Sequence, residues 1–489
     1  MTATDPAGDA IVERREPVGG RWPLLLPIIL LVLLALVLDQ SASNASAGGV
    51  RHASFAGVPT VPPVGTVAAA WYCAEGTSNP GGRADETVII ANLSSGPTTA
   101  DVQVVGGARP SMVSRTVQVE PYSQVRVHVA DLLVTAEPGV IVQTYSRSVV
   151  VEHELRAGAE LATGPCAREP ATSWDFAAGS TGQGEQLFLA LFNPFPDDAV
   201  VDVGFVSDAS PEAPGPLQGL VVPRRSRVTI PVNDQLDRRA ALAAHVEVRS
   251  GRVVAESSQV DNTADGRKGI AASLGVAGGA AVWAFPYGDA KPGIQDAIAI
   301  ANFGTTPARV SLETQLPGVI TLSPRQLNVP AQTVVVANAA ERVPLGAGFS
   351  TVIRVLSGGP VVAEQLATFK APARTTGIAA ALGVPQPARR WAFAAGRVSG
   401  ADDELIVDNP GGRPARLDVE VLSGGNRIRP LALQGLTVPA GKHARFALSA
   451  GIVPADAAVV VRADHPIGVV RAGFAPTGVT ISPGIVWPT

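Results

Sequence analysis

Trp174-Asp-Phe-Ala-Ala-Gly179 and Trp391-Ala-Phe-Ala-Ala-Gly396 are two copies of one short motif. Trp71-Tyr-Cys-Ala-Glu-Gly76 and Trp283-Ala-Phe-Pro-Tyr-Gly288 are related to them. The four tryptophans are spaced by 103, 109 and 108 residues. Because a fixed period marks an internal repeat, we predict four copies of one structural unit.

Further landmarks keep their register inside each copy. An apolar run ends in asparagine 18 to 21 residues after the tryptophan, at Asn92, Asn193, Asn302 and Asn409. These asparagines are predicted to hold turns, since asparagine tolerates left-handed backbone and bonds its own backbone. About 81 residues after each tryptophan, a Val-rich segment ends at Glu152, Glu256, Glu364 and Arg471. Because one copy reverses this charge, we expect it on the surface or paired with a local arginine.

Each copy is predicted to be a β-sandwich. Segments such as Val201–Val206 alternate with period two or form short apolar runs, and Gly, Pro and Asp-rich turns separate them. About seven short strands in roughly 105 residues match an immunoglobulin-like sandwich. Propeller blades are shorter, at about 40–50 residues. Asn233–Ala240 is the clearest helix-like stretch.

The recurring tryptophans, Trp71, Trp174, Trp283 and Trp391, have two interpretations. A large apolar side chain found once in every copy is typical of a core residue. The alternative is an exposed platform on which sugars stack. We favour the core interpretation because each copy of the fold needs the same buried side chain.

The predicted organisation is all-β, with one N-terminal membrane helix. Repeats 1 to 4 are placed at residues 67–168, 169–279, 280–387 and 388–489. A cytoplasmic tail (1–22), a transmembrane anchor or signal segment (23–39) and a flexible linker (40–66) precede them. The junctions between repeats are short, so the array is either a semi-rigid rod or a closed cluster.

Residues 23–38 form an uncharged apolar run of 16 residues. This length lies between a signal-peptide core of about 7–15 residues and a spanning helix of about 20. Arg14, Arg15 and Arg21 precede the run, which predicts a cytoplasmic N-terminus and extracytoplasmic repeats. We favour an anchor in the cell membrane. Cleavage near Ala47, which would give a secreted protein, is the alternative.

The only two cysteines, Cys73 and Cys166, fit an oxidising compartment. They are predicted to form a disulfide that ties the start of repeat 1 to its end. Two unpaired thiols are the alternative. Structural zinc takes four ligands, so two sulfurs alone predict no metal site.

Composition argues against several classes of function. The net charge of -4 is not that of a nucleic-acid binder, which needs a basic patch. The six histidines are scattered, and no catalytic motif such as H-E-x-x-H or G-x-S-x-G occurs. Glu152-His153-Glu154 is interpreted as an ordinary polar strand face on which only the two glutamates share a side. We therefore predict no enzyme, no catalytic residue and no cofactor.

A family resemblance rests on the repeat motif of W-x-F-A-x-G, N-P, V-P and V-V-A-E. It is carried by Trp174–Gly179, Asn193-Pro194, Val222-Pro223 and Ser250–Glu256. The pattern resembles a family of secreted or membrane-anchored actinobacterial proteins of unknown function over about residues 67–489. The chain departs from it at Cys73, where most copies have Phe, and at Arg471. The resemblance implies a cell-envelope setting beside envelope glycosyltransferases.

Three functional hypotheses follow. The first, which we favour, is a membrane-anchored interaction or scaffold protein of the envelope, accessory to envelope polysaccharide synthesis. The second is a cell-wall glycan-binding or adhesion protein, which predicts exposed tryptophans. The third is an enzyme whose site is assembled between repeats. The expected partner is an envelope protein or a cell-wall glycan.

Overall fold

The computed structural model describes residues 59–61, 68–106, 111–318, 320–398 and 400–487. The chain divides into compact units of residues 1–54 and 55–489, and every described residue belongs to the second. The predicted tail, the membrane segment at 23–38 and the cleavage site near Ala47 lie outside the described residues. The helices within the described ranges are all too short or too polar to span a membrane.

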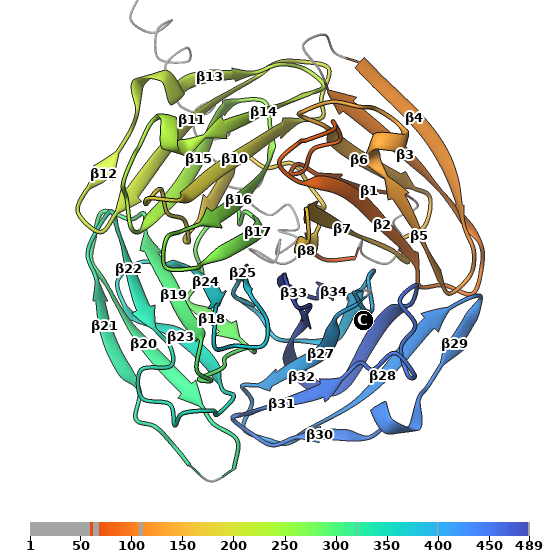
Figure 1. Cartoon of the computed structure of the whole chain (residues 1–489), viewed down its shortest axis with the longest axis vertical. Coiled ribbons are helices and arrows are strands. Elements are labelled where there is room, and N and C mark those ends of the chain that lie inside the picture. Colours follow the sequence, from red (N-terminus) through yellow and green to blue (C-terminus); the bar gives the residue numbers. More distant parts are fainter. Residues whose placement is uncertain (1–58, 62–67, 107–110, 319, 399, 488–489) are drawn as a thin grey trace, which may run out of the picture. The chain divides into compact units, whose positions relative to one another are not determined.

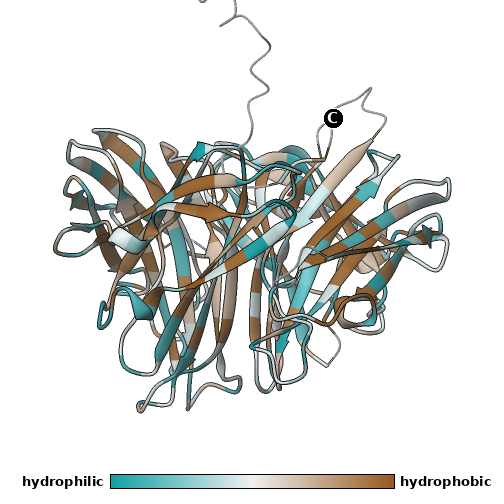
Figure 2. Cartoon of the chain, turned by 90° about the horizontal axis from the view of Figure 1, so that it is seen from above, coloured by the Kyte–Doolittle hydropathy of each residue, from teal (hydrophilic) through white to brown (hydrophobic). Residues whose placement is uncertain are grey.

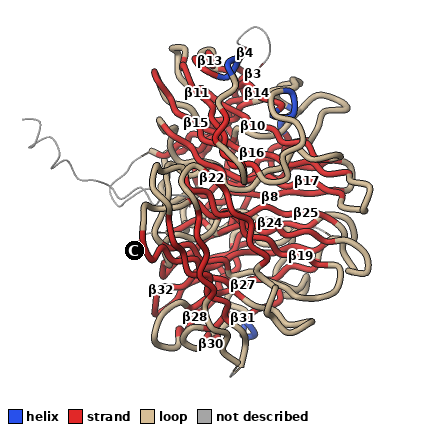
Figure 3. The backbone as a smooth tube through the Cα atoms, turned by 90° about the vertical axis from the view of Figure 1, so that its left-hand side faces the viewer, coloured by secondary structure: helices blue, strands red, loops and turns tan. Residues whose placement is uncertain are grey.

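The described chain is all-β, with only short 3-10 helices between the strands (Figure 3). Repeat 1 contains β1 (Ala69–Cys73), β2 (Asp85–Asn92), β3 (Thr98–Gly106), β4 (Ser111–Val119), β5 (Ser123–His128), η1 (Val129–Asp131), β6 (Gly139–Thr144), β7 (Val149–Ala157) and β8 (Glu160–Pro165). Repeat 2 contains β9 (Ser173–Phe176), β10 (Glu185–Asn193), β11 (Ala199–Ser207), β12 (Pro211–Glu212), η2 (Gly215–Leu217), β13 (Gln218–Val222), β14 (Ser226–Pro231), η3 (Val232–Asp234), β15 (Leu242–Ser250), β16 (Val254–Asn262) and β17 (Lys268–Leu274).

The second half repeats this order. Repeat 3 contains β18 (Val282–Phe285), β19 (Ile294–Asn302), β20 (Ala308–Gln315), β21 (Arg325–Val329), β22 (Thr333–Asn338), β23 (Ser350–Ser357), β24 (Val362–Phe369) and β25 (Gly377–Leu382). Repeat 4 contains β26 (Ala388–Phe393), β27 (Asp402–Asn409), β28 (Ala415–Ser423), β29 (Asn426–Ile428), η4 (Leu431–Leu433), β30 (Leu436–Val438), β31 (Lys442–Ala447), β32 (Ala458–Phe474), β33 (Val479–Pro483) and β34 (Ile485–Val486).

Each repeat is built from two antiparallel sheets, which we call inner and outer. In repeat 1 the inner sheet has the order β5-β2-β7-β8 and the outer sheet the order β1-β6-β3-β4. Repeat 3 has the same order, and in repeat 4 the long strand β32 takes part in both sheets. The second and fifth strands pair as in an immunoglobulin sandwich, but the first strand pairs with the sixth and the seventh with the second. The predicted all-β class is confirmed, whereas these strand pairings differ from those of an immunoglobulin sandwich.

The cores follow from the strand periodicity, because successive side chains on a strand point to opposite faces. In β3, Ala100, Val102 and Val104 are buried, while Asp101 and Gln103 between them are partly exposed. Brown and teal segments alternate along many strands in Figure 2. The predicted helix at Asn233–Ala240 is much shorter. Only Val232–Asp234 form a 3-10 turn, and Arg238 at φ 60° lies outside the right-handed helical conformation.

The four repeats contact one another in a closed ring. Their innermost edge strands β8, β17, β25 and β33 contact each other in that order, and β33 contacts β8 again (Figure 1). These backbones approach closely at glycines. A Cβ on Gly269 would lie 2.7 Å from the backbone nitrogen of Ile378, and one on Gly478 would lie 3.1 Å from that of Leu161. Of the two predicted arrangements, the described repeats form the closed cluster.

The two ends of the ring are joined by backbone hydrogen bonds. Val61 N–H donates to the carbonyl oxygen of Val486 at 2.8 Å, and Val486 N–H donates to that of Pro59 at 2.9 Å. Strand β34, which contains Val486, pairs with β26. The segment before repeat 1 therefore extends the outer sheet of repeat 4.

Candidate binding groove

A buried carboxylate connects the repeats at three of the four junctions. It extends from β7, β16 or β24 of one repeat and accepts hydrogen bonds from backbone N–H groups three or four residues after the tryptophan of the previous repeat. These bonds join Glu256 to Ala74 and Glu75 (3.1 and 2.8 Å), Glu364 to Ala177 and Ala178 (3.1 and 2.9 Å), and Glu152 to Ala395 (3.2 Å).

The predicted surface position of these glutamates is therefore wrong. Glu152, Glu256 and Glu364 are at most 1% exposed. Their strands are central in the inner sheet, and the neighbouring repeat covers the face that would otherwise meet solvent. Burial raises the pKa of Glu256 to about 7 and also raises the pKa values of Glu152 and Glu364.

Repeat 4 has Arg471 where the other repeats have glutamate, and the sequence of repeat 3 explains this difference. The residue three after the tryptophan of repeat 3 is Pro286, which has no N–H to offer a carboxylate. Arg471 is fully buried and donates to the carbonyl oxygen of Ala395 and, at 3.0 Å, to Thr163 Oγ1. Its guanidinium lies 3.7 Å from Glu152. Arg471 thus serves junction 4–1, where the ring closes.

His153 belongs to a buried ionic cluster at junction 1–2. Its Nδ1 lies 3.2 Å from Glu86 Oε1, and its Nε2 lies 3.5 Å from Glu256 Oε2. Burial disfavours the charge on His153, but the carboxylates of Glu256 and Glu86 outweigh this effect and raise its pKa to about 9. The interpretation of Glu152-His153-Glu154 as an ordinary polar strand face is wrong, because both faces of β7 are covered.

His153 and the two cysteines also bring three residues of metal-binding types together, with their ligand atoms within 4.8 Å of one another. However, Cys73 and Cys166 form a disulfide, with an S–S distance of 2.07 Å. Metal ions bind the thiolate form of cysteine, which a disulfide does not offer. The oxidised cluster therefore does not fit a metal.

The disulfide occupies a position that the other repeats fill differently. Cys73 lies two residues after its tryptophan, where repeats 2 to 4 have phenylalanine. Cys166 corresponds to glycine in those repeats. The phenylalanine–glycine pairs are Phe176 with Gly275, Phe285 with Gly383, and Phe393 with Gly484, and a Cβ on any of these glycines would lie 2.7–2.8 Å from the ring. In repeat 1 the disulfide thus takes the place of the phenylalanine ring that packs against a glycine in the other repeats.

The four recurring tryptophans are buried, at 5% exposure or less. Trp174, Trp283 and Trp391 donate their indole N–H to a carbonyl oxygen of the same repeat. In repeat 1 the guanidinium of Arg168 lies 4.8 Å from the ring centroid of Trp71. The recurring asparagines hold turns in one common way. The side-chain amide donates to the carbonyl four residues ahead in Asn92, Asn193, Asn302 and Asn409.

One of these turns forms a wall of an open groove at junction 3–4, with a volume of about 830 Å³. The floor comes from the outer sheet of repeat 3, where Val282, Ala284 and Val352 lie beside Arg354. One wall is the segment between the repeats, and the other is the turn after β27. The lining residues are Val282, Ala284, Val352, Arg354, Val384, Pro385, Gln386, Pro387, Asn409, Pro410, Gly411, Gly412, Arg413, His465 and Pro466.

Asn409 fixes this wall because its Nδ2 donates to the carbonyl oxygens of Arg413 and Val438, at 2.8 and 3.0 Å. Basic groups lie at the rim. Arg413 is exposed, and Arg354 Nε lies 3.2 Å from a carboxylate oxygen of Glu313. The arrangement can hold an apolar segment over its floor and acidic groups at its edge. The sequence predicted Asn409 as a turn residue but did not predict the groove.

The other junctions show what fills such a groove. At junction 2–3, Phe303 replaces Pro410 and packs on His245, with ring centroids 5.6 Å apart. At junction 4–1, Leu93 is buried at this position. Junction 1–2 keeps a smaller opening of about 340 Å³ beside Pro194. Apolar side chains of the protein itself therefore occupy two of the four equivalent positions.

A search of curated proteins gave no match. Among solved structures, Thermotoga maritima 1070 is 15% identical over 22% of this chain and 93% of that chain, with a TM-score of 0.20. The Escherichia coli alpha-2-macroglobulin activated by porcine elastase is 11% identical over 88% and 44%, with a TM-score of 0.11. Scores this low support no argument about fold.

A protein-family model gives the informative match. It is described as a family of unknown function, DUF5719, and it matches residues 155–282 and 257–470. The matched segments overlap and extend from repeat 1 into repeat 4. Together they span more than half of the chain, which therefore belongs to this family of unknown function.

Proposed function

We propose that the protein is a non-catalytic, membrane-anchored interaction protein on the outer side of a bacterial cell envelope. In this proposal the groove at junction 3–4 binds a segment of a partner protein. The observation that carries it is this groove of about 830 Å³, with its mostly apolar lining, at a position that the chain's own side chains fill at two other junctions. Concave apolar surfaces with a few polar groups are typical binding sites.

The use of the ionisable groups supports binding rather than catalysis. Glu152, Glu256 and Arg471 are fully buried and hold neighbouring repeats together. His153 is buried between two carboxylates of the same network. A general acid or base must reach the substrate, and these groups are buried at the junctions between repeats.

The proposed location rests on the sequence. The apolar run at 23–38, with three arginines before it, would anchor the chain with its repeats outside the cytoplasm. The disulfide between Cys73 and Cys166 is consistent with an oxidising compartment. The family resemblance suggests an enzyme of envelope polysaccharide synthesis as the partner.

The glycan-binding alternative loses its main support. It relied on tryptophan platforms, and Trp71, Trp174, Trp283 and Trp391 are buried. The described lining of the groove also contains no Phe, Tyr or Trp side chain on which a sugar could stack. We therefore propose a protein partner for the groove.

Site-specific photo-cross-linking in native membranes tests this proposal. A photoreactive residue at Gln386, on the groove, is compared with one at Leu345, which is 81% exposed and does not line it. We expect a reproducible protein cross-link from Gln386 only. Pro410→Phe copies the closed junction 2–3 and should abolish that cross-link while the melting temperature is retained.

Two outcomes contradict the proposal. Equal cross-linking from Gln386 and Leu345, or cross-linking that is unchanged by Pro410→Phe, shows that the groove is not the binding site. If no protein is captured and the full-length chain stays with the insoluble wall fraction, glycan binding replaces the proposed function.

A further inference from the structure

The outer edge of repeat 1 differs from the corresponding edges of the other repeats. Strand β4 is an uninterrupted edge strand of nine residues, paired with β3 along its whole length. In the other repeats proline-containing segments shorten or divide this edge. The corresponding strands are β12 and β13, with two and five residues, β21, with five, and β29 and β30, with three each.

An edge strand leaves a row of backbone N–H and C=O groups without strand partners. Natural proteins usually protect such edges with prolines, charges or short strands. Ser111–Val119 contains no proline and no glycine, and Arg115 is its only charged residue. Met112 and Val113 are 47% and 38% exposed. The edge of β4 is therefore suited to accept another strand.

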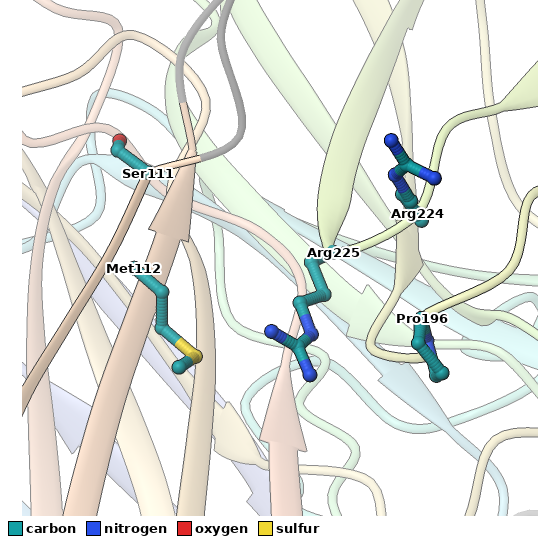
Figure 4. Close-up of a pocket in the computed structure, with 5 residues that line it drawn as sticks. All are labelled: Ser111, Met112, Pro196, Arg224 and Arg225. Atoms are coloured by element: carbon teal, nitrogen blue, oxygen red, sulfur yellow. The ribbon is translucent and has the colours of Figure 1, made fainter.

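A basic turn of repeat 2 lies beside the first residues of β4. Arg224 and Arg225 line a pocket of about 320 Å³ together with Ser111, Met112 and Pro196. Figure 4 shows Met112 on its strand facing the side chain of Arg225, with Arg224 on the far side above Pro196. Both arginines are exposed, and neither forms an ion pair with any described residue.

The backbone of this turn is fixed. Arg225 N–H donates to the carbonyl oxygen of Phe195 at 2.9 Å, and Arg224 N–H donates to Asp198 Oδ1 at 2.8 Å. The two guanidinium groups are thus presented next to β4 by a preformed turn. Guanidinium groups bind carboxylates with paired, charge-assisted hydrogen bonds.

We propose that β4 and Arg224–Arg225 form a docking site for an extended segment of a partner protein with an acidic C-terminal end. The segment adds to the outer sheet of repeat 1 as an antiparallel strand, in the manner of other β-augmentation complexes. An antiparallel strand along β4 ends beside Ser111, which places its last residues at the two arginines. This site is separate from the groove at junction 3–4 and does not depend on it.

Charge complementarity favours this occupant over a second copy of the chain. A β4–β4 pair would bring two edges together that each carry Arg115 and lie beside Arg224 and Arg225. Like charges across paired strands are destabilising. A strand that ends in carboxylates meets opposite charges instead.

The test uses the full-length protein and a synthetic probe. The probe is a seven-residue peptide of alternating valine and threonine that ends in two aspartates. Its controls are the same peptide ending in two lysines and an aspartate-ended peptide with alternate backbone nitrogens methylated. Binding is measured by calorimetry, and hydrogen-exchange mass spectrometry reports protection of 112–118.

We expect the aspartate-ended peptide to bind and to protect β4. Arg224→Ser combined with Arg225→Asn should weaken this binding by about tenfold or more, as expected for the loss of charge-assisted hydrogen bonds. Arg374→Ser combined with Arg389→Ser, two exposed arginines elsewhere, should leave binding unchanged. Equal melting temperatures of the variants establish that folding is unaffected.

Other results overturn the proposal. Absence of both binding and β4 protection at millimolar peptide rejects the site. Equal binding of the lysine-ended peptide rejects the role of the arginines, and equal binding of the methylated peptide rejects strand addition. A solution dimer that Val113→Lys dissociates identifies a second copy of the chain as the occupant. None of these results affects the cross-linking test at Gln386.

Discussion

At the scale of single residues, the junctions are held by hydrogen bonds from one repeat's backbone to the next repeat's side chain. A buried N–H group that loses its partner costs roughly 1–3 kcal/mol. Glu364 accepts two such bonds, from Ala177 and Ala178, and no arginine, lysine or histidine among the described residues forms an ion pair with it. Its value to the structure therefore lies in its oxygen atoms rather than in its charge.

Substitutions at Glu364 separate the contribution of its oxygen atoms from that of its charge. Glu364→Ala should destabilise the protein by about 3 kcal/mol, since it leaves two N–H groups unsatisfied and opens a cavity. Glu364→Gln should cost clearly less, because the amide oxygen still accepts and no charge is buried. Chemical denaturation at pH 7 measures both changes. Glu341, which is exposed, provides the control pair. If both Glu364 variants lose equal stability, the charge itself is required.

The buried acids predict an unusual dependence of stability on pH. Burial raises the pKa values of Glu256, Asp296 and Asp408 to about 7, well above those of unfolded carboxyl groups. A raised pKa gives stability that is complete below the unfolded pKa and is lost as the pH rises through the folded value. The pKa of His153 is raised from 6.5 to about 9, so its contribution to stability is also lost as the pH rises, but at higher pH.

The melting temperature should therefore fall as the pH rises from 5 to 9, which differential scanning calorimetry can measure. Asp408→Asn should flatten the part of this curve below about pH 7. The matched variant Asp402→Asn, at an exposed position, should leave the curve unchanged. A melting temperature that rises over this range would show that the interface acids are ionised at little cost.

At the scale of elements, the first strand of a repeat is tied to the segment that follows its innermost edge strand, β8, β17, β25 or β33. Repeats 2 to 4 do this with a phenylalanine against a glycine, and repeat 1 does it with Cys73 and Cys166. The two solutions occupy the same space. They differ in that only the disulfide also constrains the unfolded chain.

Replacing the disulfide of repeat 1 by a phenylalanine–glycine pair therefore tests whether the two arrangements are equivalent. Cys73→Phe combined with Cys166→Gly should retain a melting temperature well above that of Cys73→Ser combined with Cys166→Ser. The serine pair loses the disulfide, which is worth about 2–5 kcal/mol, and buries two hydroxyl groups. Thermal unfolding under oxidising conditions compares the two. A phenylalanine–glycine variant no better than the serine variant would refute the equivalence.

The strands and turns could be predicted where neighbouring residues in the sequence determine them. Alternation predicts the strands, and the turn chemistry of Asn409 and its equivalents predicts the corners of each repeat. The burial of Glu152 and His153 was not predictable, because it depends on a neighbouring repeat that single-strand periodicity does not describe. One signal was present in the sequence. Pro286, the only proline three residues after a repeat tryptophan, coincides with Arg471, the only reversed charge.

At the scale of the whole molecule, the order of the repeats is fixed by matched junctions. Phe192 lies against Gly139 at junction 1–2, where a Cβ on the glycine would be 2.5 Å from the ring. At the same position of junction 3–4, Asp408 accepts a hydrogen bond from Ser350 at 2.9 Å. Exchanging neighbours would place the phenylalanine against a serine and leave a buried aspartate unpaired. Such differences specify one cyclic order.

A circular permutant tests the closed ring directly. We expect a chain that begins at Gly279, ends at Gly278 and joins Thr489 to Pro59 through a short flexible linker to fold with a melting temperature within a few degrees of the parent. Its ends lie in the short segment between repeats 2 and 3. In a rod, repeats 1 and 4 would be far apart and the linker could not connect them. Scanning calorimetry and small-angle scattering decide between the two arrangements.

The hydrogen bonds between Pro59–Val61 and Val486 also constrain when the molecule can be completed during its synthesis. They join the first described residues of the chain to nearly the last. Repeats 1 to 3 can associate as they emerge, but Glu152 must wait for Ala395, and Val61 must wait for Val486. A chain cut short by premature termination would expose its buried charges and unpaired strands. Only a full-length chain escapes this state, which gives the cell's proteases a means of recognising incomplete copies.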